Sequence, residues 1–371
     1  MILGKNIGSV YSEGKEIQRV YSQGKLVWEK ETIDYSTIPF TVKAVKDSLK
    51  VSLLDTPSDI NDKPTTLIFN YSLNGGDWQS ATEVTINEND TISILAKNTY
   101  HINIKGVINY THESRNLVDV YGNICSLIYG ENYIGQTKWP YRYDYDTQYG
   151  FFMNCPIRSA KKLIIPSIMS SGTDRNCIRM FMHCWKMTHA PELPATTLPS
   201  YCYYQMFLGC ENLTHAPELP ATTIGEASYF EMFSGCYRLV KAPSIIPIET
   251  TPYRACEGMF RGCIDLTQPP ELPAKRANMR CYEYMFEACT SLTHAPELPA
   301  TNLGTDCYHG MFRNCYELEY IKCLATNVKD ASLYCNGWTL NVSKWGKLVC
   351  KKSSSDIRHY IPDGWEVEYI D

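Results

Sequence analysis

The sequence contains no apolar run of the roughly eighteen residues that a membrane-spanning helix needs. Its opening stretch, MILGKNIG, also lacks the basic-then-apolar order of a secretory signal. We therefore expect no membrane insertion, and we expect the chain to stay in the cytoplasm in which it is made unless processing has already removed a leader.

A basic stripe is missing too. The 35 lysines and arginines are interspersed with 40 acidic residues, and the net charge is -5. Because nucleic-acid binding depends on clustered cations that neutralise phosphates, nucleic acid is not an expected partner.

Motifs for catalysis are also lacking. The sequence has no glycine-rich phosphate loop, no nucleophile elbow and no His-Glu-x-x-His, and nothing indicates a cofactor or a metal. His183 and Cys184 are sequence neighbours, an arrangement that does not set a nucleophile against a base with an orienting third group. We predict a protein that is not an enzyme. A carbohydrate-active enzyme stays a remote alternative, because counting cannot exclude a carboxylate pair among 40 acids.

A repeat dominates the second half of the chain. The pair Met-Phe recurs every 26 or 27 residues, and a cysteine follows each Phe by three positions. The pairs begin at Met180, Met206, Met232, Met259, Met285 and Met311, and the cysteines are Cys184, Cys210, Cys236, Cys263, Cys289 and Cys315. A degenerate earlier copy starts at Phe151. A pattern of several residues at a near-fixed period predicts a solenoid, in which each unit buries its apolar face against its neighbours.

Each unit is predicted to have a helical half and an extended half. Cys202, Met206, Phe207 and Cys210 fall at i, i+4, i+5 and i+8, a spacing typical of one helix face. The prolines of the second half lack an N–H, so a parallel ladder there can span only a few residues per unit.

The chain has 16 cysteines, and most of them follow the repeat. Zinc binding or disulfides are the chemical alternatives, but tetrahedral metal sites need ligands that converge from several directions. We therefore favour inert thiols buried in the core.

A column of polar residues runs along the repeat. Its members are His189, His215, Lys241, Gln268 and His294, beside Glu192, Glu218, Ser244, Glu271 and Glu297. We predict that this column faces a ligand, and the alternative is a solvated face without a partner.

The units read Met-Phe-x-Gly-Cys-x-x-Leu-Thr-x-Ala-Pro-Glu-Leu-Pro-Ala-Thr-Thr, as from Met206 to Thr223. This pattern resembles the BspA-like leucine-rich repeats of surface proteins of anaerobic gut bacteria and of virion proteins of their phages. Local departures occur at Ser244, Gln268 and Lys275. The resemblance implies a leucine-rich-repeat solenoid with a role in structure or adhesion.

Two short apolar-polar alternations around Gly-Lys, in residues 10–17 and 20–27, predict β-hairpins that are too small to be stable alone. They serve either for attachment to a larger assembly or as an edge of the next domain. Similar openings in phage virion proteins imply attachment. The candidate attachment residues are Val10, Tyr11, Val20, Tyr21, Leu26 and Val27.

Short strands with turn signals over residues 36–107, with Trp78 as the expected central tryptophan, predict an antiparallel, immunoglobulin-like β-sandwich. An aromatic cluster follows, whose candidate ligand-facing members are Trp139, Tyr141 and Tyr143. These rings either bind sugars by face packing or fasten the cap of the solenoid to its first unit. Trp338 and Trp345 belong to an apolar segment suited to sealing the last unit.

The predicted order is a hairpin segment, a sandwich, a linker with the N-terminal cap, an α/β leucine-rich-repeat-like solenoid and a β-rich C-terminal cap. The corresponding residues are 1–31, 32–107, 108–150, 151–322 and 323–371. We favour a phage virion structural protein, such as a tail fibre or capsid decoration, that binds other virion proteins through its N-terminus and a host surface or glycan through the solenoid. A bacterial cell-surface adhesin is the alternative, and a homotrimer is one possible assembly.

Overall fold

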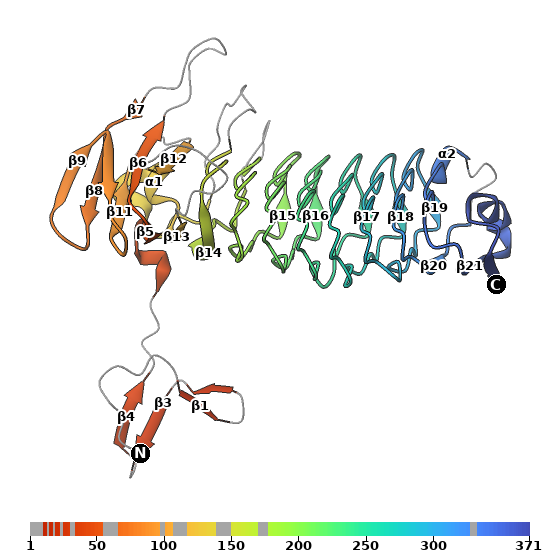
Figure 1. The fold of residues 1–371 in the computed structure, drawn as a ribbon, viewed down its shortest axis with the longest axis horizontal. Helices are drawn as coiled ribbons and strands as arrows, with labels where there is room; N and C mark the ends of the chain where they lie inside the picture. Colours follow the sequence, from red (N-terminus) through yellow and green to blue (C-terminus); the bar gives the residue numbers. More distant parts are fainter. Residues whose placement is uncertain are drawn as a thin grey trace.

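The computed structural model describes residues 10–12, 15–17, 19–22, 25–29, 34–54, 66–96, 101–106, 117–138, 150–169, 177–326 and 332–371 (Figure 1). Strand β1 (Val10–Ser12) pairs antiparallel with β2 (Lys15–Ile17), and β3 (Arg19–Ser22) pairs with β4 (Lys25–Glu29). Both predicted hairpins are therefore present. The side chains of the six candidate attachment residues lie outside the described part of the chain, so attachment stays a prediction.

Two sheets follow, and their apolar side chains form one core. In one sheet the order is β10-β6-β12, with β7 also paired to β6, and in the other it is β14-β13-β5-β11-β8-β9. The strands are β5 (Phe40–Lys46), β6 (Leu49–Leu54), β7 (Thr66–Leu67), β8 (Phe69–Leu73), β9 (Trp78–Ala81), β10 (Glu83–Ile86), β11 (Thr91–Leu95), β12 (His101–Gly106), β13 (Leu117–Asn123) and β14 (Ile157–Ile164).

The alternation of β5 shows why these residues form a half-buried strand. Phe40, Val42 and Ala44 are fully buried on one face, and Lys43 on the other face is exposed. Thr41, which shares the face of Lys43, is buried, and its hydroxyl lies 2.9 Å from that of Ser93. The expectation of a central tryptophan is wrong, because Trp78 lies on the edge strand β9 and is 49% exposed. Buried aliphatic side chains such as Val42, Leu53 and Ile92, together with the rings of Phe40 and Phe69, belong to the core instead.

Strand β14 joins the sheets to the repeat. It pairs in parallel with β13 on one side, and Ser159 within it forms a parallel bridge to His189 of the first complete unit on the other. The short elements beside this junction are η1 (Tyr35–Thr37), α1 (Ser126–Tyr129) and η2 (Gly130–Tyr133).

From residue 150 onward the chain winds into successive coils that stack on one another, which we call the coil stack (Figure 1). Two-residue strands pair in parallel from coil to coil: β15 (Thr197–Leu198) with β16 (Thr223–Ile224), and β17 (Thr250–Thr251) with β18 (Arg276–Ala277) and β19 (Asn302–Leu303). The ladders are short because proline precedes them, as the sequence predicts.

The predicted helical half of each unit is wrong. Residues 201–210 form turns in which Tyr201, Gln205 and Gly209 have positive φ, and the same four-residue spacing recurs in later coils. The backbone N–H groups of Tyr203, Gln205 and Phe207 donate to the next coil, whereas those of the residues between them donate three residues back. A helix would use every N–H internally, so this conformation leaves half of them to bond the stack together.

The interior of the coil stack contains the repeated Met, Phe and Cys side chains, all of which are buried. Stacked rings form a phenylalanine column, whose members are Phe152, Phe181, Phe207, Phe233, Phe260, Phe286 and Phe312. From Phe181 to Phe312, the centroids of neighbouring rings are 5.4 to 5.8 Å apart, and the rings are nearly parallel. The six repeat cysteines donate their Sγ–H to the Phe carbonyl of the preceding coil over 3.0 to 3.2 Å.

A parallel sheet closes the far end, formed by β20 (Tyr320–Cys323), β21 (Gly346–Lys351) and β22 (Trp365–Ile370). Helices α2 (Ser332–Cys335) and η3 (Lys352–Tyr360) lie between these strands in sequence. Trp338 is fully buried, and its Nε1–H donates to the carbonyl of Tyr360. Trp345 does not seal the last unit, because it is 64% exposed.

The structure thus confirms a β-rich chain with several sheets and few helices. Over the ranges given above, it contains no helix with the length and apolar character required to cross a membrane.

Candidate functional site

The polar column predicted from the sequence lies on the surface of the coil stack. His215, Lys241 and Gln268 occupy consecutive parallel bridges, so equivalent positions of neighbouring coils lie side by side. His294 is bridged to Tyr320 and its ring stacks on that tyrosine at 5.6 Å. All five residues of the column are exposed.

The acidic members are also exposed, and some have fixed partners. Glu218 accepts hydrogen bonds from the backbone N–H of Ser244 at 2.9 Å and from its hydroxyl at 2.6 Å. The carboxylate of Glu297 forms an ion pair with Lys322 at 3.1 Å. The backbone of Glu271 forms a parallel β-bridge with Ile245. The Ser244 that interrupts the acidic row in the sequence therefore orients the carboxylate of the preceding coil.

The first two complete units enclose an open groove of about 480 Å³. It is lined by Lys161 and by two consecutive copies of the segment Thr-His-Ala-Pro-Glu, which begin at Thr188 and Thr214, with further prolines after them. The structure therefore brings together four of the predicted ligand-facing residues: His189, Glu192, His215 and Glu218. The others, Lys241, Gln268, Glu271, His294 and Glu297, continue along the same surface outside the lining of this groove.

Each histidine of the column is held by the threonine before it. Nδ1 of His189 lies 2.9 Å from the hydroxyl of Thr188, and Nδ1 of His215 lies 3.0 Å from the hydroxyl of Thr214. The Thr188 hydroxyl also donates to the carbonyl of Arg158 at 3.1 Å. A hydroxyl has one proton, so Thr188 accepts from Nδ1–H of His189. In the neutral form of this ring, Nε2 is then an acceptor.

The aromatic candidates Trp139, Tyr141 and Tyr143 lie outside the described residues. Their predicted part in ligand binding stays a prediction.

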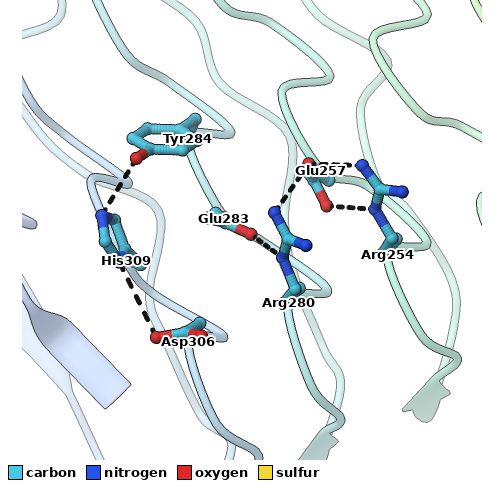
Figure 2. A network of polar contacts seen from close by, with 7 residues as sticks. All are labelled: Arg254, Glu257, Arg280, Glu283, Tyr284, Asp306 and His309. Atoms are coloured by element: carbon cyan, nitrogen blue, oxygen red, sulfur yellow. Dashed lines mark hydrogen bonds and ion pairs between the residues drawn. The ribbon is translucent and has the colours of Figure 1, made fainter. Parts of the chain in front are cut away.

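Reasoning from the sequence missed a second polar cluster, on the turn segments of the later coils (Figure 2). Arg254 bonds both oxygens of Glu257 at 2.7 and 3.0 Å, and Arg280 bonds Glu283 while lying 3.6 Å from Glu257. The two glutamates are buried and the arginines are about one-third exposed. The hydrogen bond with Glu283 raises the pKa of Arg280 above its ordinary value. An i,i+3 Arg-Glu pair recurring after 26 residues is the sequence signal that could have revealed this cluster.

In the next coil the acidic residue comes first in the sequence and the basic residue second. Asp306 and His309 replace the arginine and the glutamate, and Nε2 of His309 lies 3.0 Å from the hydroxyl of Tyr284 (Figure 2). This Tyr-His-Asp chain has the order of a nucleophile, a base and an orienting acid. However, Nδ1 of His309 is 3.7 Å from Asp306, too far for a hydrogen bond. Burial, followed by Glu283, raises the pKa of Tyr284, so its phenol is not activated as a nucleophile. The arrangement therefore lacks the activated nucleophile and the oriented base of a catalytic triad.

Burial lowers the reactivity of the thiols. All 16 cysteines are buried. Burial raises the pKa of Cys281 to about 12, as it does for Cys323. Because the thiolate is the nucleophile and the metal ligand, neither reaction is favoured in the folded protein.

No protein-family profile matches the chain, and no curated protein matches it in sequence. Among solved structures it is similar to a leucine-rich repeat protein from Bacteroides ovatus ATCC 8483, with 18% sequence identity and a TM-score of 0.28. The similarity covers 57% of this chain and 60% of that protein, so this chain spans about three-fifths of its length.

Proposed function

We propose that the protein is a structural component of a phage virion that attaches by its N-terminal hairpins and displays the coil stack for adhesion to a host surface or glycan. On this proposal the coil stack is a BspA-like leucine-rich-repeat solenoid, the two preceding sheets form an immunoglobulin-like module, and the protein is not an enzyme. The repeat pattern described above supports the family assignment, and the paired hairpins are consistent with a docking end.

The observation that carries the adhesive role is the groove. His189, Glu192, His215 and Glu218 project from a backbone that inter-coil hydrogen bonds hold in register. A binding surface on such a framework loses little conformational freedom when it takes a ligand, and the saved entropy appears as affinity. The many tyrosines of the chain, 27 in all, suit interfaces as well.

Two measurements test the proposal. Mass spectrometry of purified virions from the phage that encodes the chain should detect it, and its absence from particles would exclude the virion role. A bacterial surface adhesin would instead be recovered from cell envelopes in the absence of phage. Binding of the full chain to immobilised host glycans tests the adhesive role, which a blank array would contradict.

A further inference from the structure

We infer that the groove takes a glycan without acidic groups, whose hydroxyls donate hydrogen bonds to fixed acceptors. This inference rests on the proposed adhesive function and names the ligand class of the same site. Three properties of the groove support it: its charge, its hydrogen-bonding groups and its apolar surfaces.

The charge of the lining disfavours anions. One cation, Lys161, stands against two carboxylates, Glu192 and Glu218. A sugar carboxylate or sulfate would enter a groove that is already net negative, where like charges repel. A glycan of hydroxyls and ether oxygens meets no such repulsion.

The groove offers mainly acceptors. The Thr188 hydroxyl donates its single proton to the backbone carbonyl of Arg158 and therefore accepts from Nδ1–H of His189, so in the neutral form of this ring Nε2 is an acceptor. Glu218 is oriented by two hydrogen bonds from Ser244, both to Oε2, and its other oxygen has acceptor capacity. Hydrogen bonds to charged acceptors are the strong ones, so hydroxyl donors gain most here.

Much of the remaining lining is apolar, with alanine, leucine and proline side chains. Prolines follow each histidine in both units, at Pro191, Pro194, Pro217 and Pro220. Pro194 and Pro220 are exposed, Pro217 is half-buried, and Pro191 is buried. A pyranose ring has C–H faces as well as hydroxyl edges, so its faces can pack on proline while its edges reach the acceptors. The groove volume of about 480 Å³ falls within the common range of small-molecule sites, roughly 300 to 1,000 Å³.

The test is calorimetric titration of the full chain with matched pairs of oligosaccharides. Galactose oligomers are compared with galacturonate oligomers, and mannose oligomers with mannuronate oligomers, at pH 7 and constant ionic strength. We expect a neutral member to bind at least about tenfold more tightly than its acidic counterpart, the ratio that one charge-assisted hydrogen bond provides.

Variants locate the binding. Glu192→Gln and His215→Ala should each weaken the neutral oligomer about tenfold or more. The matched controls are Glu271→Gln and His294→Ala, which alter equivalent residues outside the groove and should change the affinity less than about twofold.

The possible outcomes separate the two proposals. If an acidic oligomer binds as tightly as its neutral partner, the ligand class is wrong while adhesion to glycans stands. If the control variants weaken binding as much as the groove variants, or if the groove variants leave it unchanged, the site is wrong. If neither member of any pair binds, adhesion to these glycans is itself excluded, whatever the virion analysis shows.

Discussion

Truncation of one ring in the phenylalanine column should be among the most damaging single changes in this protein. Phe233 is fully buried, and its ring centroid lies 5.4 Å from that of Phe207 and 5.6 Å from that of Phe260. Removal of a buried Phe side chain costs about 3 to 5 kcal/mol, and each stacked aromatic pair contributes roughly 0.5 to 1.5 kcal/mol. Because two pairs are lost together, we expect Phe233→Ala to lower the free energy of unfolding by about 5 kcal/mol.

Urea unfolding followed by circular dichroism measures this loss, with Phe233→Leu as the comparison. Leucine keeps most of the apolar volume but removes both ring pairs, so its expected cost is only about 1 to 3 kcal/mol. A loss of unfolding free energy below about 2 kcal/mol for Phe233→Ala would refute the reasoning, because removal of a ring that is stacked on both faces in a buried core should destabilise the fold by more than that.

Three further predictions concern the thiols, the turns and the charged cluster. Burial raises the pKa of Cys281 to about 12 in the folded chain, against about 8.5 in the unfolded chain. Because the unfolded chain then loses the thiol proton first, the urea midpoint of unfolding should fall as the pH rises above about 8.5. Equal midpoints at pH 7 and pH 10 would contradict this prediction. Gly310→Ala should destabilise by about 2 to 3 kcal/mol in thermal melts, since the new Cβ would lie 2.3 Å from the Tyr284 ring at positive φ. Gly235→Ala, with no such neighbour within 3.7 Å, should cost about 1 to 2 kcal/mol from backbone strain alone. Glu257→Gln should cost about 1 to 2 kcal/mol in urea and leave a stability less sensitive to salt.

The sequence predicts the side chains of the coil stack better than its backbone. The period of 26 or 27 residues places equivalent positions in register, and the Met-Phe-Cys triplets are buried as that register requires. The backbone prediction failed because the turns repeat every four residues. Cys202, Met206 and Cys210 face one way in such turns, and a period of four is close to the 3.6 of a helix.

The candidate site was predictable as a column but not as a groove. His189, His215 and His294 each lie in a copy of the same Thr-His-Ala-Pro-Glu motif, yet only His189 and His215 line the groove. Its lining includes Lys161, a residue of β14, which belongs to the same sheet as β13 and β5. No local pattern links that lysine to the repeat, because the contact arises from the tertiary junction between β14 and the first complete coil.

The phenylalanine column also sets the mechanics of the molecule. Phe40 of β5 stacks on Phe152 at 5.5 Å, and the far end of the column meets Trp338 beneath the closing sheet. Tension applied to the far end of the coil stack is expected to pass through the inter-coil hydrogen bonds and the stacked rings to the two sheets. The length of this lever arm is then a whole number of increments of about 5.4 to 5.8 Å, so gain or loss of one unit would lengthen or shorten its reach without disturbing either end.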